Sequence, residues 1–298
     1  KMLYRDNEIL IFDEPTAVLT PQEIDELMAT MKEFAKEGKS ILFISHKLNE
    51  IMEVSDRVTV LRKGKYIGTV EVHKEPAQPR QAVLSLRDFC VPSKAHKRNA
   101  VNHVSFDVRA GEILCIAGID GNGQTELVYG LTGLEKCSGG TATLCGEDIS
   151  HASIRHRGKN LSHIPEDRHK HGLVLDFTLE QNLVLQRYQE KRFQAKGFIN
   201  RGAVREYASQ LIAQYDVRSG QGPVTAARSM SGGNQQKAII ARELDREKPL
   251  IVAVQPTRGL DVGAIEYIHS QLVAERDKGR AVLLVSLELD EVMNLSDR

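Results

Sequence analysis

The sequence GIDGNGQT at residues 118–125 lies between the apolar run EILCIAG, which has the pattern of a buried strand, and TELVYGL, which has the pattern of a helix. It matches the phosphate-loop pattern G-x-x-x-x-G-K-[ST] at every position except the lysine, which is Gln124. Glycines allow backbone N–H groups to converge on phosphate oxygens, and the helix N-terminus adds a favourable dipole. The stretch therefore predicts an α/β fold with a weak nucleotide site. A glycine-rich turn without a ligand has the same pattern, so the motif alone leaves that alternative open.

Part of the chain is repeated at an offset of 241 residues. Residues 9–57 align without a gap on residues 250–298, and 13 of the 49 positions are identical. The identical pairs include Pro15 and Pro256, Thr16 and Thr257, Gly38 and Gly279, and Ser45 and Ser286. An offset of this size indicates a tandem domain and not a solenoid. We expect residues 1–75 to be the C-terminal part of a first domain, 76–80 a linker, and 81–298 a second domain that lacks its last hairpin.

Each copy has the pattern of strands that alternate with helices. ILIFDEP at 9–15 and SILFISH at 40–46 are predicted to be buried parallel strands, joined by a helix over 21–39. RVTVLRKGKYIGTVEV at 57–72 alternates around a Lys-Gly turn and predicts a β-hairpin. Strand-like runs open the second copy, and the polar stretch 168–247 predicts an inserted helical subdomain.

Composition limits the classes of function. The chain carries 40 Lys and Arg against 40 Asp and Glu, so its formal net charge is zero. A neutral chain is a poor candidate for sequence-independent binding of nucleic acid, which requires a basic field. No stretch approaches the roughly 18 apolar residues of a membrane span. We therefore expect any link to a membrane to run through a partner.

Four motifs and the repeat resemble the ABC ATPase superfamily. The motifs are DEPTAVLTPQE at 13–23, PEDRHKHGLVLDF at 165–177, SGGNQQK at 231–237 and QPTRGLDVGAIE at 255–266. They are most similar to those of the duplicated ATPase subunits of bacterial simple-sugar and nucleoside importers, and HKHGLVLDF favours the nucleoside branch. The resemblance implies an ABC-type nucleotide-binding domain of α/β class, with a RecA-like parallel-sheet core, an antiparallel β subdomain and a helical subdomain.

The resemblance also implies roles for particular residues. Asp13 and Glu14 resemble a Walker B segment, in which the aspartate holds Mg²⁺ and the glutamate polarises the attacking water. His46 resembles the switch histidine that contacts the terminal phosphate. SGGNQQK resembles the signature motif, whose serine and glycines face the phosphate held by the opposite ATPase domain. Met230 stands where that motif usually has leucine.

Two further loops correspond in position to the Q-loop and the D-loop of the family. Glu166 falls where most ABC domains carry the Q-loop glutamine, and this departure weakens a metal role for the position. The second copy keeps the D-loop Gly259-Leu260-Asp261, whereas the first copy has Val18-Leu19-Thr20 there.

The second copy lacks the catalytic groups of the first. Val254 replaces Asp13, Gln255 replaces Glu14, Leu287 replaces His46, and Gln124 replaces the lysine of the phosphate loop. A valine cannot bind a metal, a glutamine cannot act as a base, and a leucine side chain cannot hydrogen-bond. Local drift in an unrelated fold would not select four functional positions while the neighbouring residues keep the motif. We therefore expect the second copy to be non-hydrolytic.

Because ABC sites are composite, these roles predict one competent site and one degenerate site. The first copy's Walker B segment and His46 would pair with the second copy's signature. The first copy's phosphate loop is absent from the chain, so we expect this chain alone to be inactive and its parent to be an ATP hydrolase that drives transport. The expected cofactors are ATP and Mg²⁺. The predicted nucleotide-binding residues are Gly118, Asp120, Gly121, Asn122, Gly123, Gln124, Thr125, Glu126, Ser231, Gly232 and Gly233; the predicted metal ligands are Asp13 and Thr125; and the predicted catalytic residues are Glu14 and His46.

The resemblance implies integral-membrane permease subunits as partners, and an extracytoplasmic substrate-binding protein as an indirect one. It places the protein at the cytoplasmic face of the plasma membrane, bound through the permease, with no nucleic-acid partner. The apolar strands of residues 9–72 need a neighbour, so self-association is also expected. Two alternatives stay open: an ABC protein that acts on nucleic acid or the ribosome, and a purely structural ABC scaffold.

Overall fold

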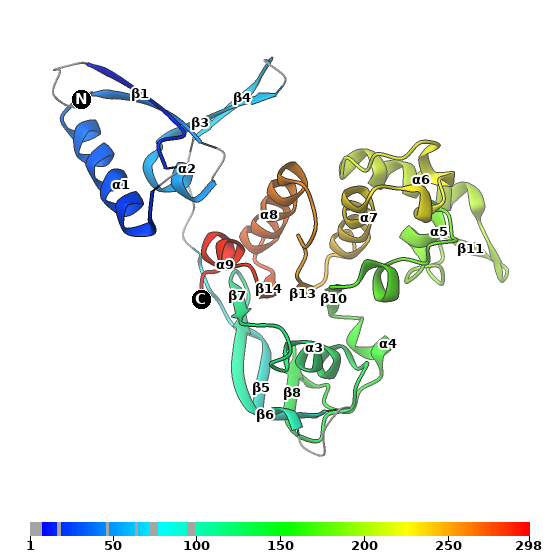
Figure 1. Ribbon diagram of the computed structural model, residues 1–298. Helices are drawn as coiled ribbons and strands as arrows, with labels where there is room; N and C mark the ends of the chain where they lie inside the picture. Colours follow the sequence, from blue (N-terminus) through cyan, green and yellow to red (C-terminus); the bar gives the residue numbers. More distant parts are fainter. Residues whose placement is uncertain (1–7, 17–18, 46–47, 63–64, 72–76, 94–98) are drawn as a thin grey trace. The chain divides into compact units, whose positions relative to one another are not determined.

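The computed structural model describes residues 8–16, 19–45, 48–62, 65–71, 77–93 and 99–298. The chain divides into two compact units, Lys1–Pro76 and Ala77–Arg298 (Figure 1). Each unit is described by itself below.

In the first unit, two strands pair in a parallel sheet that is not covered on both faces. The prediction that both strands are buried is wrong, because Ile9, Ile11, Leu42 and Ile44 are exposed. The elements of this unit are β1 (Ile9–Asp13), α1 (Pro21–Lys36), β2 (Ser40–Ile44), α2 (Leu48–Val54), β3 (Arg57–Arg62) and β4 (Lys65–Glu71). Helix α1 begins with a capping box, because Thr20 and Glu23 satisfy each other's backbone N–H groups. Strands β3 and β4 pair antiparallel, which confirms the predicted hairpin.

The second unit contains two four-stranded sheets. The parallel sheet has the order β10-β13-β14-β7, with strands Leu161–Ile164, Leu250–Val254, Ala281–Ser286 and Ile113–Ala117. The antiparallel sheet has the order β6-β5-β8-β9, with strands Asn99–Arg109, Ala82–Pro92, Gly139–Leu144 and Glu147–Asp148. Every residue of β13 and β14 is buried, as expected of central parallel strands covered on both faces. The predicted α/β class is confirmed.

Helix α3 (Gln124–Thr132) joins the two sheets, because it follows β7 and packs on β5 and β6. Its last carbonyl groups have no partner within the helix. Arg157, at the end of α4 (Ile154–Arg157), is buried and donates to the carbonyls of Gly130 and Leu131, at 2.9 Å each. This contact fixes the end of α3 farthest from the phosphate loop.

The stretch 168–247 is mostly helical (Figure 1). It contains η2 (Arg168–Gly172, a π-helix), α5 (Leu179–Val184), α6 (Arg201–Gln214), the 3₁₀ turns η3 (Gly222–Val224) and η4 (Ala227–Ser229), and α7 (Gly232–Leu244). It also contains a hairpin of two-residue strands, β11 (Gln194–Ala195) and β12 (Phe198–Ile199), which the sequence pattern did not predict. Strands this short cannot show an alternating pattern. Among the described helices of the chain, none is long and apolar enough to span a bilayer.

The repeat is visible in matching backbone geometry. Strands β1 and β2 pair in the same register as β13 and β14, since Leu10 opposes Ile41 and Ile251 opposes Val282. In both units a threonine bonds a buried glutamate of a later helix: Thr16 Oγ1 donates to Glu50 at 2.7 Å, and Thr257 Oγ1 donates to Glu291 at 2.8 Å. That glutamate lies on α2 in the first unit and on α9 (Leu289–Leu295) in the second. The two segments therefore share one fold.

Candidate functional site

The phosphate-loop motif forms the turn from β7 into α3. Gly123 is the N-cap of α3 and has φ = 96°, in the left-handed region that favours glycine. A Cβ at this position would lie 2.6 Å from the carbonyl oxygen of Ala100, so a larger residue does not fit. The backbone of a phosphate-binding turn is thus present, with the first amides of α3 at its end.

Gln124 folds back onto this loop. Its side-chain Nε2 donates to the carbonyl oxygen of Ile119 at 3.0 Å, and its Oε1 accepts from the backbone N–H of Asn122 at 3.1 Å. A phosphate oxygen bound in the loop would compete with Oε1 for that N–H. Gln124, which stands in the lysine position, therefore supplies no positive charge. It also occupies the backbone N–H of Asn122, which a bound phosphate would need as a donor.

The environment of Thr125 does not fit a magnesium site. Thr125 lines a cavity of about 40 Å³ together with Val254, which stands where the repeat places an aspartate. Two carboxylates also line the cavity: Glu166 forms an ion pair with Arg258, and Asp167 accepts from the backbone N–H groups of the loop that follows it. Burial lowers the pKa of His163, in the same lining, to about 4, so this ring is neutral at physiological pH. No described group of three or more His, Cys, Asp or Glu side chains is arranged to hold a metal ion.

Glu14 and its counterpart Gln255 have the same unusual backbone. Their φ angles are 41° and 43°, in a region that non-glycine residues rarely adopt. The backbone N–H of Glu14 donates to Ile44 at 2.8 Å, and that of Gln255 donates to Val285 at 2.7 Å. Such strain is typical of functional positions, and it persists in the copy that has lost its carboxylate. Asp13 lies at the exposed end of β1, and His46 is outside the described residues.

The signature motif opens α7, and Ser231 is its N-cap residue. The serine hydroxyl makes no capping bond to its own helix and accepts from Asn234 Nδ2 at 2.9 Å, which leaves its proton available to a ligand. The D-loop lies beside the motif, because a Cβ on Gly233 would be 3.7 Å from Asp261 Oδ2. Asp261 itself caps α8 (Val262–Asp277) through the N–H of Ala264, at 3.0 Å.

The other end of α7 is held by the buried carboxylate of Glu243. It accepts from Arg242 at 2.9 Å, Arg246 at 2.8 Å, Gln186 at 2.8 Å and the backbone N–H of His163 at 3.3 Å. The pKa of Glu243 is lowered: although burial opposes ionisation, the two arginines outweigh it. Glu243 was not among the residues predicted from the sequence, although a glutamate within the apolar run AIIARELD could have indicated it. The cluster fixes the signature helix relative to β10.

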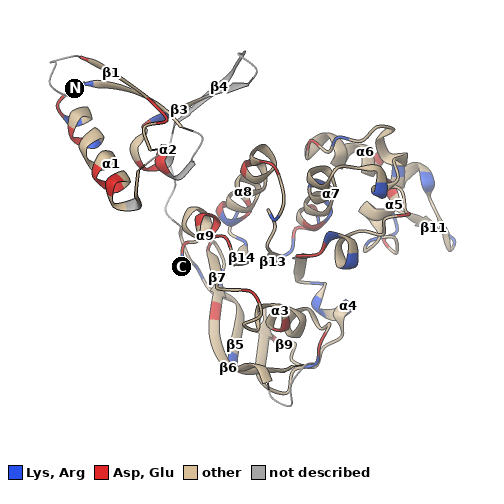
Figure 2. Cartoon of the chain, in the orientation of Figure 1, with Lys and Arg blue, Asp and Glu red and all other residues tan. Residues whose placement is uncertain are grey.

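A groove of about 740 Å³ passes this cluster, and its lining is both apolar and basic. Leu134, Ile154, Leu185 and Tyr188 are exposed hydrophobic residues of the lining. Figure 2 shows Lys and Arg around this region of the second unit. Among the described residues, no carboxylate lies within ion-pair distance of the lining cations Arg155, Lys159 and Lys248. Burial lowers the pKa of Lys248, and the neighbouring Arg246 and Arg187 lower it further.

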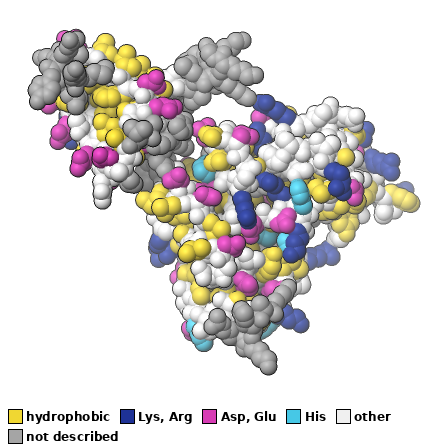
Figure 3. All heavy atoms as spheres, in the orientation of Figure 1, with side chains coloured by type: hydrophobic (Ala, Val, Ile, Leu, Met, Phe, Trp, Pro, Cys, Tyr) yellow, Lys and Arg dark blue, Asp and Glu magenta, His cyan; other side chains and the backbone are white. Residues whose placement is uncertain are grey.

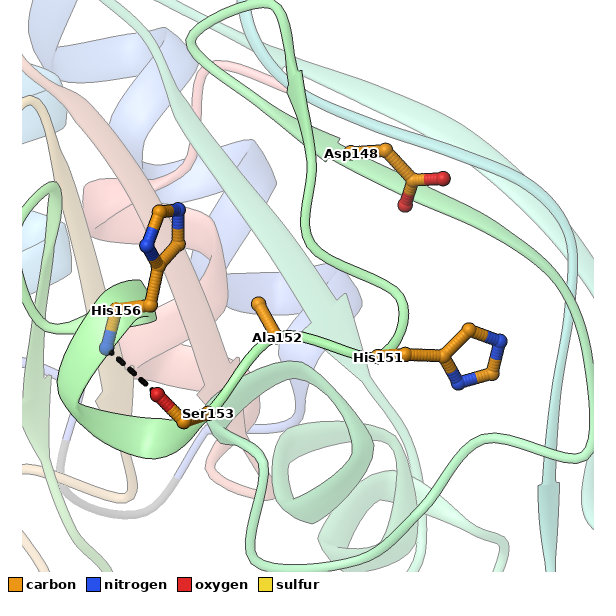
Figure 4. A pocket seen from close by; sticks show the side chains of 5 residues that line it. All are labelled: Asp148, His151, Ala152, Ser153 and His156. Atoms are coloured by element: carbon orange, nitrogen blue, oxygen red, sulfur yellow. Dashed lines mark hydrogen bonds between the residues drawn. The ribbon is translucent and has the colours of Figure 1, made fainter.

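Two surface features away from these motifs suggest no further site. The depression beside α4 in Figure 4 has a volume of about 460 Å³, but the side chains of Asp148, His151 and His156 point in different directions and do not converge. On the face drawn in Figure 3, Lys and Arg are interspersed with Asp and Glu over the second unit. That face therefore shows no continuous basic field of the kind that nucleic acid requires.

Comparison with known proteins shows the family of the chain. The family profile described as ABC transporter matches residues 101–258. Over the whole chain, the Nucleoside import ATP-binding protein NupA of Lactococcus lactis subsp. cremoris is 49% identical, and the Guanosine import ATP-binding protein NupO of Bacillus subtilis is 51% identical. The Glucose import ATP-binding protein TsgD13 of Haloferax volcanii is 41% identical over the whole chain. The chain spans 63%, 62% and 58% of the lengths of these three relatives.

Solved structures agree on the fold. A dimeric ATP-binding cassette in a post-hydrolysis state with ADP and phosphate has a TM-score of 0.60 over 72% of this chain and 94% of that chain, at 20% identity. The ATP-binding subunit of an ABC transporter has a TM-score of 0.57 over 72% of this chain and 83% of that chain, at 22% identity. Both similarities confirm the predicted ABC-type fold.

Proposed function

Because the chain belongs to the ABC transporter family of ATPases, we propose that it is part of an ATP-hydrolysing subunit that drives the import of nucleosides through a membrane permease. A protein of the relatives' length is called the full-length protein below. Nucleosides are favoured over sugars because the two relatives named for nucleoside or guanosine import share 49% and 51% identity with the chain, against 41% for the relative named for glucose import. The permease binding places the protein at the cytoplasmic face of the membrane.

The observation that carries the mechanism is the division of groups between the two units. The first unit keeps Asp13 and Glu14 at the end of β1, whereas the second unit keeps the signature serine at the start of α7. In a composite site, Asp13 would hold Mg²⁺, Glu14 would orient and polarise the attacking water, and Ser231 would donate to the terminal phosphate. Bound MgATP supplies the phosphoryl group and the metal charge. A phosphate loop with a lysine would complete this site, whereas the loop at 118–125 has Gln124 in the lysine position.

The second unit's own loop would form the degenerate site. Gly118, Gly121 and Gly123 would shape the turn around the phosphates, and Asp120, Asn122, Gln124, Thr125 and Glu126 would complete the nucleotide site. Val254 stands in the Walker B aspartate position, and Glu166, in the same cavity as Thr125, is paired with Arg258, so metal-assisted chemistry is not expected here. This site would bind nucleotide weakly and would not hydrolyse it.

The groove beside Glu243 is the proposed contact with the permease. Its exposed apolar residues and its cations without described carboxylate partners fit an amphipathic segment with acidic side chains. An occupant of the groove would lie next to Gln186, which bonds Glu243 at the end of the signature helix. Binding there would therefore act on the helix that carries Ser231.

The function is tested by uptake into proteoliposomes that contain the full-length protein and its permease. We expect ATP to drive the accumulation of labelled guanosine at least tenfold faster than that of labelled glucose. The control is the same preparation with ADP in place of ATP. Faster uptake of glucose would contradict the nucleoside assignment, and equal uptake with ADP would contradict the role of hydrolysis.

A substitution at Gln124 tests the degenerate site. In this chain, Gln124→Lys should tighten ATP binding about tenfold, because a charged hydrogen bond contributes about 1.5–3 kcal/mol against about 1 for a neutral one. The control Gln124→Ala frees the N–H of Asn122 without adding charge, so we expect a smaller gain. Isothermal titration calorimetry measures both affinities. If Gln124→Lys left the affinity unchanged, the loop at 118–125 would not be the nucleotide site.

A structural scaffold remains the second candidate for the second unit. It is supported by the closed conformation of Gln124 and by Val254 and Gln255 in the catalytic positions. The calorimetric experiment separates the two, because a scaffold would bind no ATP in either the wild-type or the Gln124→Lys protein.

A further inference from the structure

Arg168 lies beside the signature motif, although it belongs to a different loop. It is the first residue of η2, which is capped by Asp167 through the N–H groups of His169 and Lys170. Its Nη1 donates to the carbonyl oxygen of Arg258 at 3.3 Å. A Cβ on Gly232 would lie 3.6 Å from its Nη2 and 3.8 Å from its Cζ. The guanidinium therefore sits next to the first turn of α7.

The positive charge of Arg168 is not balanced locally. Within the part of the chain that the structure describes, no carboxylate lies within ion-pair distance of Arg168. Glu166, two residues earlier, already pairs with Arg258. The N-terminus of α7 adds partial positive charge of its own through its unpaired N–H groups. Two positive features thus adjoin at the surface that carries Ser231, and their arrangement suits an anion.

We propose that Arg168 is a further catalytic residue of the composite site, where its guanidinium contacts the terminal phosphate of the nucleotide held by the other ATPase domain. This inference rests on the proposed function, because it requires the signature to face that phosphate. Arginine suits the role, since its planar donors match phosphate oxygens and it keeps its charge at all physiological pH values. Its contribution is greatest as charge moves during phosphoryl transfer.

A purely structural role gives a different expectation. The bond from Arg168 to the carbonyl of Arg258 could serve only to anchor the loop before the D-loop. In that case a neutral hydrogen-bond donor of similar length would replace the arginine, and a positive charge would not be required. A catalytic cation, in contrast, is replaced by another cation and not by a neutral donor.

The test compares Arg168→Lys with Arg168→Gln in the full-length protein with its permease. We expect Arg168→Gln to lower kcat for ATP about 100-fold with KM changed less than threefold, and Arg168→Lys to lower kcat less than tenfold. The matched control is Arg228→Gln, because Arg228 is also close to the signature in sequence but is exposed and pairs with Asp176. Its kcat should stay within twofold of wild type.

The kcat values of these variants distinguish a catalytic from a purely structural role of Arg168. If Arg168→Gln and Arg168→Lys had kcat values within twofold of each other, whether both high or both low, Arg168 would not act as a catalytic cation. Ser231→Arg is measured in the same preparation. If Ser231→Arg were also as active as wild type, the composite-site function itself would be wrong; if it were inactive while Arg168→Gln was not, only this inference would fail.

Discussion

The full-length protein carrying Ser231→Arg is expected to retain less than about 1% of ATP-driven uptake. The serine hydroxyl makes no capping bond to the backbone of its own helix and only accepts from Asn234, so its proton is available to a phosphate held by the other domain. Removing one such donor typically costs about 10²–10³ in rate, and the added arginine side chain would also prevent close approach of the two domains. ATPase rate and transport should both be measured in proteoliposomes that contain the permease.

Gln255→Ala provides the matched control for this variant. Gln255 occupies the catalytic-base position of the second unit, but a glutamine carries no base to lose. We expect uptake within about threefold of wild type. If Gln255→Ala proved as damaging as Ser231→Arg, a model with one competent site would be wrong.

Glu14→Gln should reduce ATP hydrolysis by the full-length protein at least about 100-fold, since loss of a general base typically costs 10²–10⁴. The structure places Glu14 directly after β1, in the strained conformation that Gln255 shares. The substitution keeps the size of the side chain, so binding of ATP should change little. Glu53→Gln is the control, because Glu53 is an exposed carboxylate paired only with Lys32 among the described contacts. A Glu14→Gln rate near that of the control would exclude Glu14 as the base.

Most of the fold could be predicted from local sequence patterns. Buried parallel strands such as LIVAV are continuous apolar runs, and the α1 helix is marked by Thr20, Pro21 and Glu23 at its start. The predicted helix over 21–39 ends in the structure at Lys36, because Gly38 adopts φ = 89°. The repeat added independent support, and the matching registers of the two strand pairs confirm it.

The local motifs of the site could also be predicted, but the contacts between them could not. Gln124 was identified as a lost charge, whereas its hydrogen bonds to Ile119 and Asn122 depend on the shape of the loop. The ion pair of Glu166 with Arg258 joins residues 92 apart in sequence, and the bond from His163 to Glu243 joins residues 80 apart. Nothing in either segment alone indicates such a partner.

The role proposed for Arg168 could not be predicted from the sequence either. PEDRHKHGLVLDF contains it, and the motif indicates the family but not that this arginine lies against Gly232. That proximity arises because η2 and the start of α7 meet only in the folded chain. Residues that act on a ligand held elsewhere are the hardest to find from sequence, since neither their neighbours nor their ligand lie in the same motif.

In the proposed mechanism, Glu14 and Ser231 serve one and the same hydrolytic site. The most direct test is the ATPase rate of the full-length protein with Glu14→Gln, with Ser231→Arg, and with both substitutions, at saturating ATP. One shared site predicts that all three proteins fall to the same floor, near 1% of wild type or below. Two independently active sites would instead leave each single variant with about half of the wild-type rate, and only the double variant would reach the floor; that result would contradict the account.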